Sequence, residues 1–230
     1  MILETTLKTG LIIPLHDAHN RIVGFVGRSL TGEDPKYFNS RGTDLYKKGS
    51  LLFGLNFAAH EIKRNESAYL VEGNADVIKM HQLGYTNTVG SCGTALTRDQ
   101  ILILKKICNS ITIIPDNDGA GKTACDKSAK MILTEGMNCN IIHLPDSKEK
   151  SDADSFFTDA DHFKEYAHDN VQDYIIGKAS RWSQLPKSPE ITRRAIDEVS
   201  ALIYQMDPSV HDLYIDQVSK LIKPKKACSI

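Results

Sequence analysis

Three groups of carboxylate side chains each follow a short apolar segment that is typical of a buried strand. Glu72 ends the first segment, and Asp116 and Asp118 follow the second. Asp152 and Asp154 come shortly after the third segment. Ligands of open parallel sheets bind beyond the carboxyl ends of the strands, so we expect these acids to lie close together.

An acidic centre of this kind is suited to binding a metal ion. Clustered carboxylates repel one another unless a cation lies between them, and hard oxygen ligands favour Mg²⁺ or Mn²⁺ over zinc. Such sites usually serve phosphate chemistry, in which metals hold the attacking and leaving oxygens. Gly73, Gly119 and Gly121 adjoin these acids and let the backbone approach a metal or phosphate closely.

Two other interpretations apply to residues 116–123. The stretch DNDG at 116–119 is, taken alone, typical of a turn. Acids in corresponding positions after the two other segments favour a site over a turn. The stretch GAGKT at 119–123 resembles the end of a P-loop, but that pattern requires glycine at position 116, where this chain has Asp116. We therefore reject an ATPase P-loop.

The elements that must position these residues alternate between strand and helix. Short buried strands that alternate with helices predict an α/β fold with a mainly parallel sheet and helices on both faces. The expected strands are residues 69–71, 88–89, 111–114 and 139–144, and the expected helices are 75–83, 98–108 and 122–134.

The flanking regions follow different patterns. Residues 11–16 and 21–26 predict a β-hairpin with a turn at 17–20. Residues 27–50 lack a clean period and predict a long functional loop. A short helix at 57–64 follows, and after residue 155 the pattern is helical to the end. There, helices at 191–206 and 208–222 are expected, with Asp207 as a cap.

Charge and cysteine content narrow the function classes. The net charge is 28 − 29 = −1, yet residues 8–64 hold nine Lys/Arg against five Asp/Glu, whereas 65–160 hold nine against thirteen. A basic N-terminal segment beside an acidic centre is therefore expected. The five cysteines include no CxxC pair, which argues against a zinc-binding site and against a disulfide framework. A chain without disulfides is expected in the reducing cytoplasm. No signal peptide or membrane span is indicated.

These motifs resemble those of a known family. The stretches EGNAD (72–76) and DNDGAG (116–121) resemble the two acidic motifs of Toprim domains, which bacterial primases, topoisomerases and some nucleases share. The surroundings are similar to DnaG-type primases, and the resemblance covers nearly the whole chain. The stretches that carry it are GFVGR (24–28), PKYFNS (35–40), TDLYKKG (43–49), SCGTALT (91–97), LPD (144–146), DAD (152–154) and the tail 201–214.

The resemblance implies synthesis of RNA primers from ribonucleoside triphosphates on a single-stranded DNA template. It implies that Glu72, Asp116 and Asp118 bind the catalytic Mg²⁺ or Mn²⁺, with Asp152 and Asp154 also at the metal centre. Residues of the family's basic groove, which contacts template and nucleotide phosphates, are Arg28, Lys36, Asn39 and Lys48. Supporting residues are Gly73, Asp76, Gly93, Thr94 and Gly121; Thr94 and Thr97 are equally suited to capping the helix at Arg98.

The resemblance also implies three units and some departures from the family. A partial basic subdomain is expected at residues 1–64, a Toprim domain at 65–158 and a helical subdomain at 159–230. The family's zinc module, half of its basic subdomain and its helicase-binding domain are expected to be absent from this chain, although a replicative helicase remains a partner of the family. The stretch 146–152 carries extra charged residues, and elongation is expected more firmly than initiation.

Two alternative functions stay open at this point. The same acids would serve a Toprim nuclease that activates water, although the primase-like residues 24–49 disfavour it. A non-catalytic remnant that only binds single-stranded DNA would explain a truncated basic groove, but it would not need the intact acidic motifs. A topoisomerase is disfavoured because no separate domain supplies a strand-cleaving tyrosine.

Overall fold

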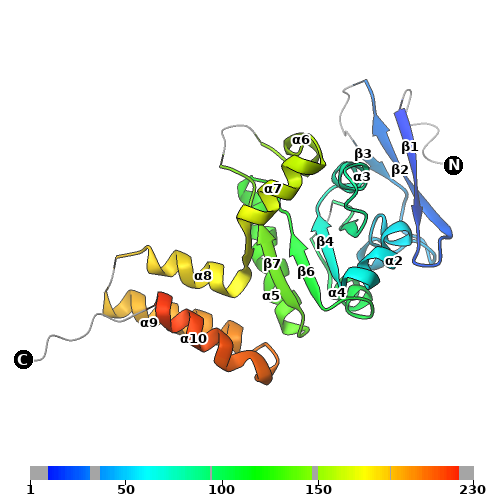
Figure 1. Ribbon diagram of the computed structural model, residues 1–230. Coiled ribbons are helices and arrows are strands. Elements are labelled where there is room, and N and C mark those ends of the chain that lie inside the picture. The colour runs from blue at the N-terminus through cyan, green and yellow to red at the C-terminus, as the bar shows by residue number, and fades with distance from the viewer. Residues whose placement is uncertain (1–9, 32–36, 94, 147–149, 187, 223–230) are drawn as a thin grey trace, which may run out of the picture.

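The computed structural model describes residues 10–31, 37–93, 95–146, 150–186 and 188–222. They form two β-sheets and a set of helices (Figure 1). No helix in these ranges is long and apolar enough to cross a membrane.

The first sheet is antiparallel and small, with strand order β1-β2-β3. The expected hairpin is confirmed, but the expected loop at 27–50 is wrong in part. It contains the end of β2, a third strand that pairs with β2 through residues 26–28, and a short 3₁₀ helix. Apolar alternation is too short in this third strand to be recognised from sequence. The elements are β1 (Gly10–His16), β2 (Ile22–Ser29), β3 (Tyr37–Asn39) and η1 (Lys48–Ser50).

The second sheet has the order β5-β4-β6-β7-β8, in which the first four strands are parallel and β8 is antiparallel to β7. The expected α/β fold with a mainly parallel sheet is therefore confirmed. The strand β8 lies where helix was expected, because a three-residue edge strand leaves no periodic pattern. The strands are β4 (Ser67–Val71), β5 (Thr88–Gly90), β6 (Ser110–Ile113), β7 (Asn138–Ile142) and β8 (Val171–Asp173).

Helices cover both faces of the five-stranded sheet. One face packs in a large apolar core with α2, α4, α5 and α8, and the other packs in a smaller core with α3, α6 and α7. In Figure 1 the last three helices lie together, to the left of α5 and β7 and reaching below them. The helices are α2 (Leu55–Asn65), α3 (Asn74–Gln82), α4 (Arg98–Lys105), α5 (Gly119–Thr134), α6 (Ala153–Phe156), α7 (Ala160–Asn170), α8 (Tyr174–Ser183), α9 (Pro189–Ile203), η2 (Pro208–Val210) and α10 (His211–Leu221).

Short polar side chains set where several helices begin. Thr97 caps α4 by accepting a hydrogen bond from the Gln100 amide, so capping is the role that the structure gives it. Asp118 caps α5 and Asp152 caps α6 in the same manner. Asp207 caps η2, as expected. Two carboxylates of the acidic centre therefore also fix the start of a helix.

A backbone bridge joins the N-terminal region to the edge of the five-stranded sheet. The Phe53 amide donates to the Gly90 carbonyl at 2.9 Å, and the Gly90 amide donates to the Phe53 carbonyl at 3.0 Å. A side chain at position 90 would meet Val77 Cγ2 at 2.9 Å, so glycine allows this close approach. The two sheets are thus held beside each other at β5.

Candidate functional site

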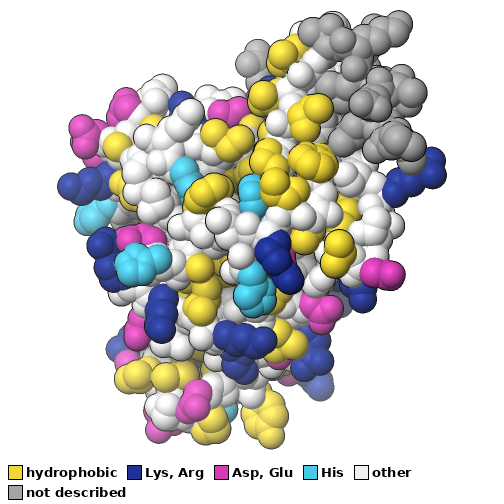
Figure 2. Space-filling model, turned by 90° about the vertical axis from the view of Figure 1, so that its right-hand side faces the viewer, with side chains coloured by type: hydrophobic (Ala, Val, Ile, Leu, Met, Phe, Trp, Pro, Cys, Tyr) yellow, Lys and Arg dark blue, Asp and Glu magenta, His cyan; other side chains and the backbone are white. Residues whose placement is uncertain are grey.

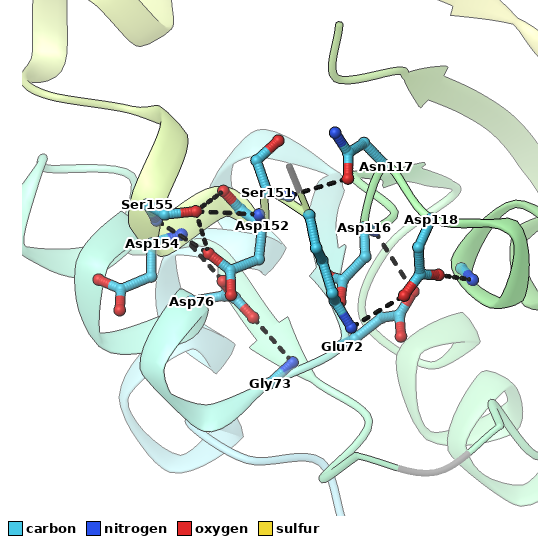
Figure 3. A network of polar contacts seen from close by, with 12 residues as sticks. Glu72, Gly73, Asp76, Asp116, Asn117, Asp118, Ser151, Asp152, Asp154 and Ser155 are labelled. Carbon is cyan, nitrogen blue, oxygen red and sulfur yellow. Dashed lines mark hydrogen bonds and ion pairs between the residues drawn. The ribbon is translucent and has the colours of Figure 1, made fainter. Parts of the chain in front are cut away.

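The structure brings the predicted acids together beside a cavity of about 340 Å³. Figure 3 shows them in two groups, with Glu72, Asp116 and Asp118 on one side and the other three on the opposite side. Glu72 follows β4, and Asp116 follows β6. The second group is Asp76 of α3 with Asp152 and Asp154 at the start of α6. Parallel pairing of β4 with β6 aligns these strand ends.

Glu72 and Asp116 lie against each other in a half-buried position. The Asp116 amide donates to Glu72 Oε1 at 3.4 Å. Burial raises the pKa of both carboxyls, and the Asp116 charge further raises that of Glu72. A Cβ at position 121 would lie 2.6 Å from the Asp116 carbonyl and 3.0 Å from Glu72 Oε1. Glycine at 121 is therefore what lets α5 start so close to these two acids.

Lys150 lies between the carboxylates of Asp116 and Asp118. Its Nζ is 3.0 Å from Asp116 Oδ2 and 2.9 Å from Asp118 Oδ2. These bonds raise the pKa of the ammonium group. The Gly121 amide donates to Asp118 Oδ1 at 2.7 Å, and this bond together with Lys150 lowers the pKa of Asp118. The Lys150 ammonium group thus balances the charge of Asp116 and Asp118, two of the acids that we expected to bind a metal ion.

Asp76 ties the second acidic group to the strand end of β4. Its Oδ2 accepts from the Gly73 amide at 3.0 Å, and its Oδ1 accepts from the Asp154 amide at 2.9 Å. Burial raises the pKa of Asp76 to about 7, and the Asp152 charge adds to that effect. A Cβ at position 73 would lie 2.6 Å from Asp76 Oδ2, which explains the glycine there.

Asp152 and Asp154 line the cavity from the start of α6. The Asp152 side chain accepts from the Ser155 amide at 2.9 Å, so one of its oxygens is engaged in capping. The preceding loop is anchored to the DNDG turn. Here the Ser151 amide donates to Asn117 Oδ1 at 2.8 Å and the Asn117 amide donates to the Ser151 carbonyl at 3.1 Å. This pairing places the third acidic motif against the second.

Basic and polar side chains from the three-stranded sheet and η1 form the opposite wall. Arg28, Asn39 and Lys48 line the same cavity as the acids. The Arg28 guanidinium lies 5.6 Å from the centre of the Tyr37 ring, a cation–π distance. Tyr37 also lines the cavity. The basic segment and the acidic centre, which the sequence separates, thus face each other.

The other predicted residues divide into three cases. Gly73 and Gly93 line the cavity. Gly121 and Asp118 do not line it, but Gly121 packs against Asp116, and Asp118 reaches the centre through Lys150. Lys36 and Thr94 lie outside the described residues.

Sequence reasoning missed two residues of this site. Asn74 lines the cavity, is 8% exposed, and its Oδ1 finds no hydrogen-bond donor within the described part of the chain. The position of Asn74 directly after Glu72 and Gly73 was the one feature of the sequence that could have indicated a place in the site. Lys150 was missed because its loop carries mixed charges, and only the extra length of 146–152 marked it.

The residues present fit a divalent cation. The donors are carboxylate oxygens together with the orphaned amide oxygen of Asn74, and this is the oxygen set that Mg²⁺ and Mn²⁺ prefer. Among the residues that the structure describes, no three His, Cys, Asp or Glu side chains converge closely enough to hold an ion together. Lys150 is the cation between two of the donors. Ion binding at Asp116 and Asp118 therefore requires that Lys150 move or share its place.

Two family models match the chain. One is described as Toprim-like and matches residues 69–157. The other is described as the N-terminal domain of the DNA primase catalytic core and matches residues 4–59. Together they cover both the acidic wall and the basic wall of the cavity.

Curated and solved proteins show the same similarity. The DNA primase of Clostridium acetobutylicum is 36% identical over an alignment of 218 residues that covers 92% of this chain and 35% of that protein. A DNA primase domain from Pseudomonas aeruginosa superposes with a TM-score of 0.81 at 25% identity, over 94% of this chain and 69% of that one. A DnaG primase catalytic domain bound to ssDNA gives 0.79 at 25% identity, over 92% and 69%. The chain thus spans about a third of the curated relatives it matches.

Proposed function

The chain belongs to the DnaG-type DNA primase family, and on this premise we propose that it carries out metal-dependent RNA primer synthesis on single-stranded DNA. The observation that carries the proposal is a cavity with carboxylates on one wall and Arg28, Asn39 and Lys48 on the other. Nucleotidyl transfer needs this combination, because phosphates require cationic partners while the reacting centre requires metal ligands.

Glu72, Asp116 and Asp118 are the residues that would hold Mg²⁺ or Mn²⁺, with Asp152 and Asp154 beside them. When bound, the metal supplies charge that stabilises the attacking and leaving oxygens of a phosphoryl transfer. The raised pKa values of Glu72 and Asp116 reflect burial and repulsion from neighbouring carboxylates, which a cation relieves. Asn74 Oδ1 adds a neutral oxygen donor at the same cavity.

The chain's own residues bind and orient the substrates. Arg28 and Lys48 bind phosphates of the template or the incoming ribonucleotide, and Asn39 contributes hydrogen bonds. Tyr37 presents a ring on which a base can stack. Asp76 is a positioning residue, since its bonds to the Gly73 and Asp154 amides fix the distance between two acidic motifs. The similarity to a DnaG domain bound to ssDNA supports this template class.

We divide these tasks among three units of the chain. Residues 1–64 supply the basic wall, residues 65–158 supply the metal-binding Toprim unit, and residues 159–230 supply the edge strand β8 and the last helices. The matched model ranges 4–59 and 69–157 support a division near residue 64. Elongation chemistry lies within the first two units.

The experiment is incorporation of labelled ribonucleotides on single-stranded DNA, with and without an annealed RNA primer, in Mg²⁺ or Mn²⁺. We expect metal-dependent extension that Asp116→Ala abolishes, while Asp169→Ala, an exposed acid in α7, retains it. If only the primed template is extended, initiation would depend on segments of the longer relatives that this chain does not match. Cleavage of the DNA without incorporation would establish the nuclease instead, and binding without reaction would establish the non-catalytic alternative.

A further inference from the structure

A second cavity, of about 320 Å³, lies between α5, β7 and α8. It shares no lining residue with the acidic cavity. Its volume is at the lower end of the range for small-molecule sites, about 300–1,000 Å³. Three nitrogen-bearing side chains line it: Lys122 near the start of α5, His143 after β7 and Arg181 of α8.

Arg181 is the cation with spare binding capacity. Its guanidinium donates one hydrogen bond, to His143 Nε2 at 3.3 Å. Within the residues that the structure describes, no carboxylate lies in ion-pair range of Arg181. Burial and the charges of Arg181 and Lys122 lower the pKa of His143, so the ring accepts from Arg181 in its neutral form. The rest of the guanidinium fork has no partner among the described residues and can bind an anion.

The acids at this cavity do not cancel its positive charge. Asp126 accepts a hydrogen bond from Tyr174 Oη at 2.7 Å and forms ion pairs with Lys178 Nζ at 2.5 Å and Lys130 Nζ at 2.9 Å. Its negative charge is therefore already balanced. Asp146 pairs with Lys122, but its side chain is 86% exposed and competes with water. An anion entering the cavity can therefore replace Asp146 at Lys122.

Part of the lining is apolar and well packed. Cys125, Ile141 and Leu144 line the cavity and are each less than 6% exposed. Guanidinium, ammonium and imidazole groups then approach one bound group from α5, β7 and α8. Arg binds phosphate in a bidentate manner while Lys acts as a point charge, and a phosphoryl group offers three acceptor oxygens to this donor set, whereas a carboxylate offers two.

We propose that this cavity is a binding site for a phosphate-bearing small molecule, held by Arg181 and Lys122 with His143 beside them. The phosphoryl group takes the free donors of Arg181 and replaces Asp146 at Lys122. The shared chemistry is a phosphate or pyrophosphate group, either as the free anion or as the terminal phosphates of a nucleotide. The site does not depend on the acidic centre.

The test is titration of the whole chain with sodium pyrophosphate, inorganic phosphate or a ribonucleoside triphosphate in metal-free buffer. Metal-free buffer removes metal-mediated binding at the acidic cavity, and the Arg181 variants and the His143 signals separate binding at the second cavity from binding at Arg28 and Lys48. Binding is measured by calorimetry, and the His143 ring signals in NMR report the location. We expect Arg181→Ala to weaken binding at least tenfold and Arg181→Lys to weaken it less. Asp146→Asn is expected to strengthen binding about threefold, because it removes the competitor.

Arg193→Ala is the matched control, because Arg193 is an exposed arginine on α9 whose side chain is 85% exposed. It should bind like the unmodified chain. Tighter binding of pyrophosphate than of the triphosphate identifies the free anion as the source, and the reverse order identifies a nucleotide. The proposal is overturned if none of the three anions binds. It is also overturned if both Arg181 variants bind normally, if Asp146→Asn weakens binding, or if the His143 signals do not move.

Discussion

The three-stranded and the five-stranded sheet build opposite walls of one cavity but are held in place to very different degrees. In the five-stranded sheet the strands are covered on both faces, and residues such as Ile111 and Ile142 are fully buried. In the three-stranded sheet Leu15 and Val26 are buried, but Ile12 is 55% exposed and Leu11 is 51% exposed. Figure 2 looks onto the side of the molecule where the three-stranded sheet lies, and it shows hydrophobic side chains gathered in the upper part of the view.

The comparison teaches that the two walls have separate physical requirements. The proposed metal ligands need fixed relative positions, and the acids obtain such positions from strand ends, helix caps and hydrogen bonds to amides. Phosphate contacts tolerate more movement, because they act through charge over longer distances. The basic wall can therefore be built on a sheet with one open face.

The largest expected effect is on the core of the five-stranded sheet. Ile111→Ala should lower the free energy of unfolding by about 2–5 kcal/mol, because it leaves a cavity in a fully buried position. Ile12→Ala on the open face of the small sheet should change it by less than about 0.5 kcal/mol. Urea unfolding followed by circular dichroism measures both. Equal losses in the two variants would contradict the contrast between the sheets.

The next effect concerns the cation of the acidic wall. Lys150→Ala should strengthen Mn²⁺ binding roughly tenfold, or about 1.4 kcal/mol, because the ion no longer competes with the ammonium group. Electron paramagnetic resonance measures free Mn²⁺ directly. The control is Lys127→Ala, because Lys127 is an exposed lysine of α5. Unchanged affinity would show that Lys150 does not compete, whereas failure of every variant to bind Mn²⁺ would reject the metal site itself.

A smaller effect is expected at the basic wall. Arg28→Ala should weaken binding of single-stranded DNA several-fold, and it should reduce the slope of log K against log salt by about 0.7 per lost phosphate contact. Fluorescence anisotropy at several salt concentrations measures both quantities. Arg64→Ala, whose side chain pairs with Glu61 on α2, should leave both unchanged. A slope that stays the same in Arg28→Ala would remove Arg28 from the phosphate contacts.

The smallest effect is a pH dependence in the helices that cover the five-stranded sheet. Burial alone would raise the pKa of Asp126, but hydrogen bonds from Lys178, Lys130 and Tyr174 outweigh it and hold the pKa below its ordinary value of 3.8. A carboxyl with a lowered folded-state pKa stabilises the fold above its unfolded pKa and loses this contribution as pH falls further. As the pH is lowered from 5 to 2, the melting temperature should therefore fall less steeply in the Asp126→Asn variant than in the unmodified chain. Parallel curves would show that Asp126 contributes no such term.

Much of the five-stranded sheet was predictable because its strands are buried and its helices are amphipathic. The runs around Val71 and Ile113 are apolar on both sides of the backbone, as expected for strands covered on both faces. The acids after them were predictable because parallel strands end at one edge. The strands β3 and β8 were not, because each has three residues and too little side-chain pattern to distinguish it from a loop.

The site was less predictable where it depends on tertiary contacts. That Arg28 and Lys48 face the acids was suggested by charge distribution and family resemblance, but their shared cavity follows from how the two sheets sit together. The place of Lys150 between two carboxylates depends on the path of its loop, which local sequence does not determine. The same holds for Arg181, whose helix is distant in sequence from Lys122.

The bridge between Phe53 and Gly90 gives each wall of the cavity a natural reporter of their separation. Both amide protons are held by carbonyls from the opposite part of the chain, at 2.9 and 3.0 Å. Amide hydrogens exchange with solvent only when such bonds open. Once divided by the intrinsic exchange rate of each amide, deuterium uptake at these two positions should therefore give one common free energy of opening, the cost of parting the two segments.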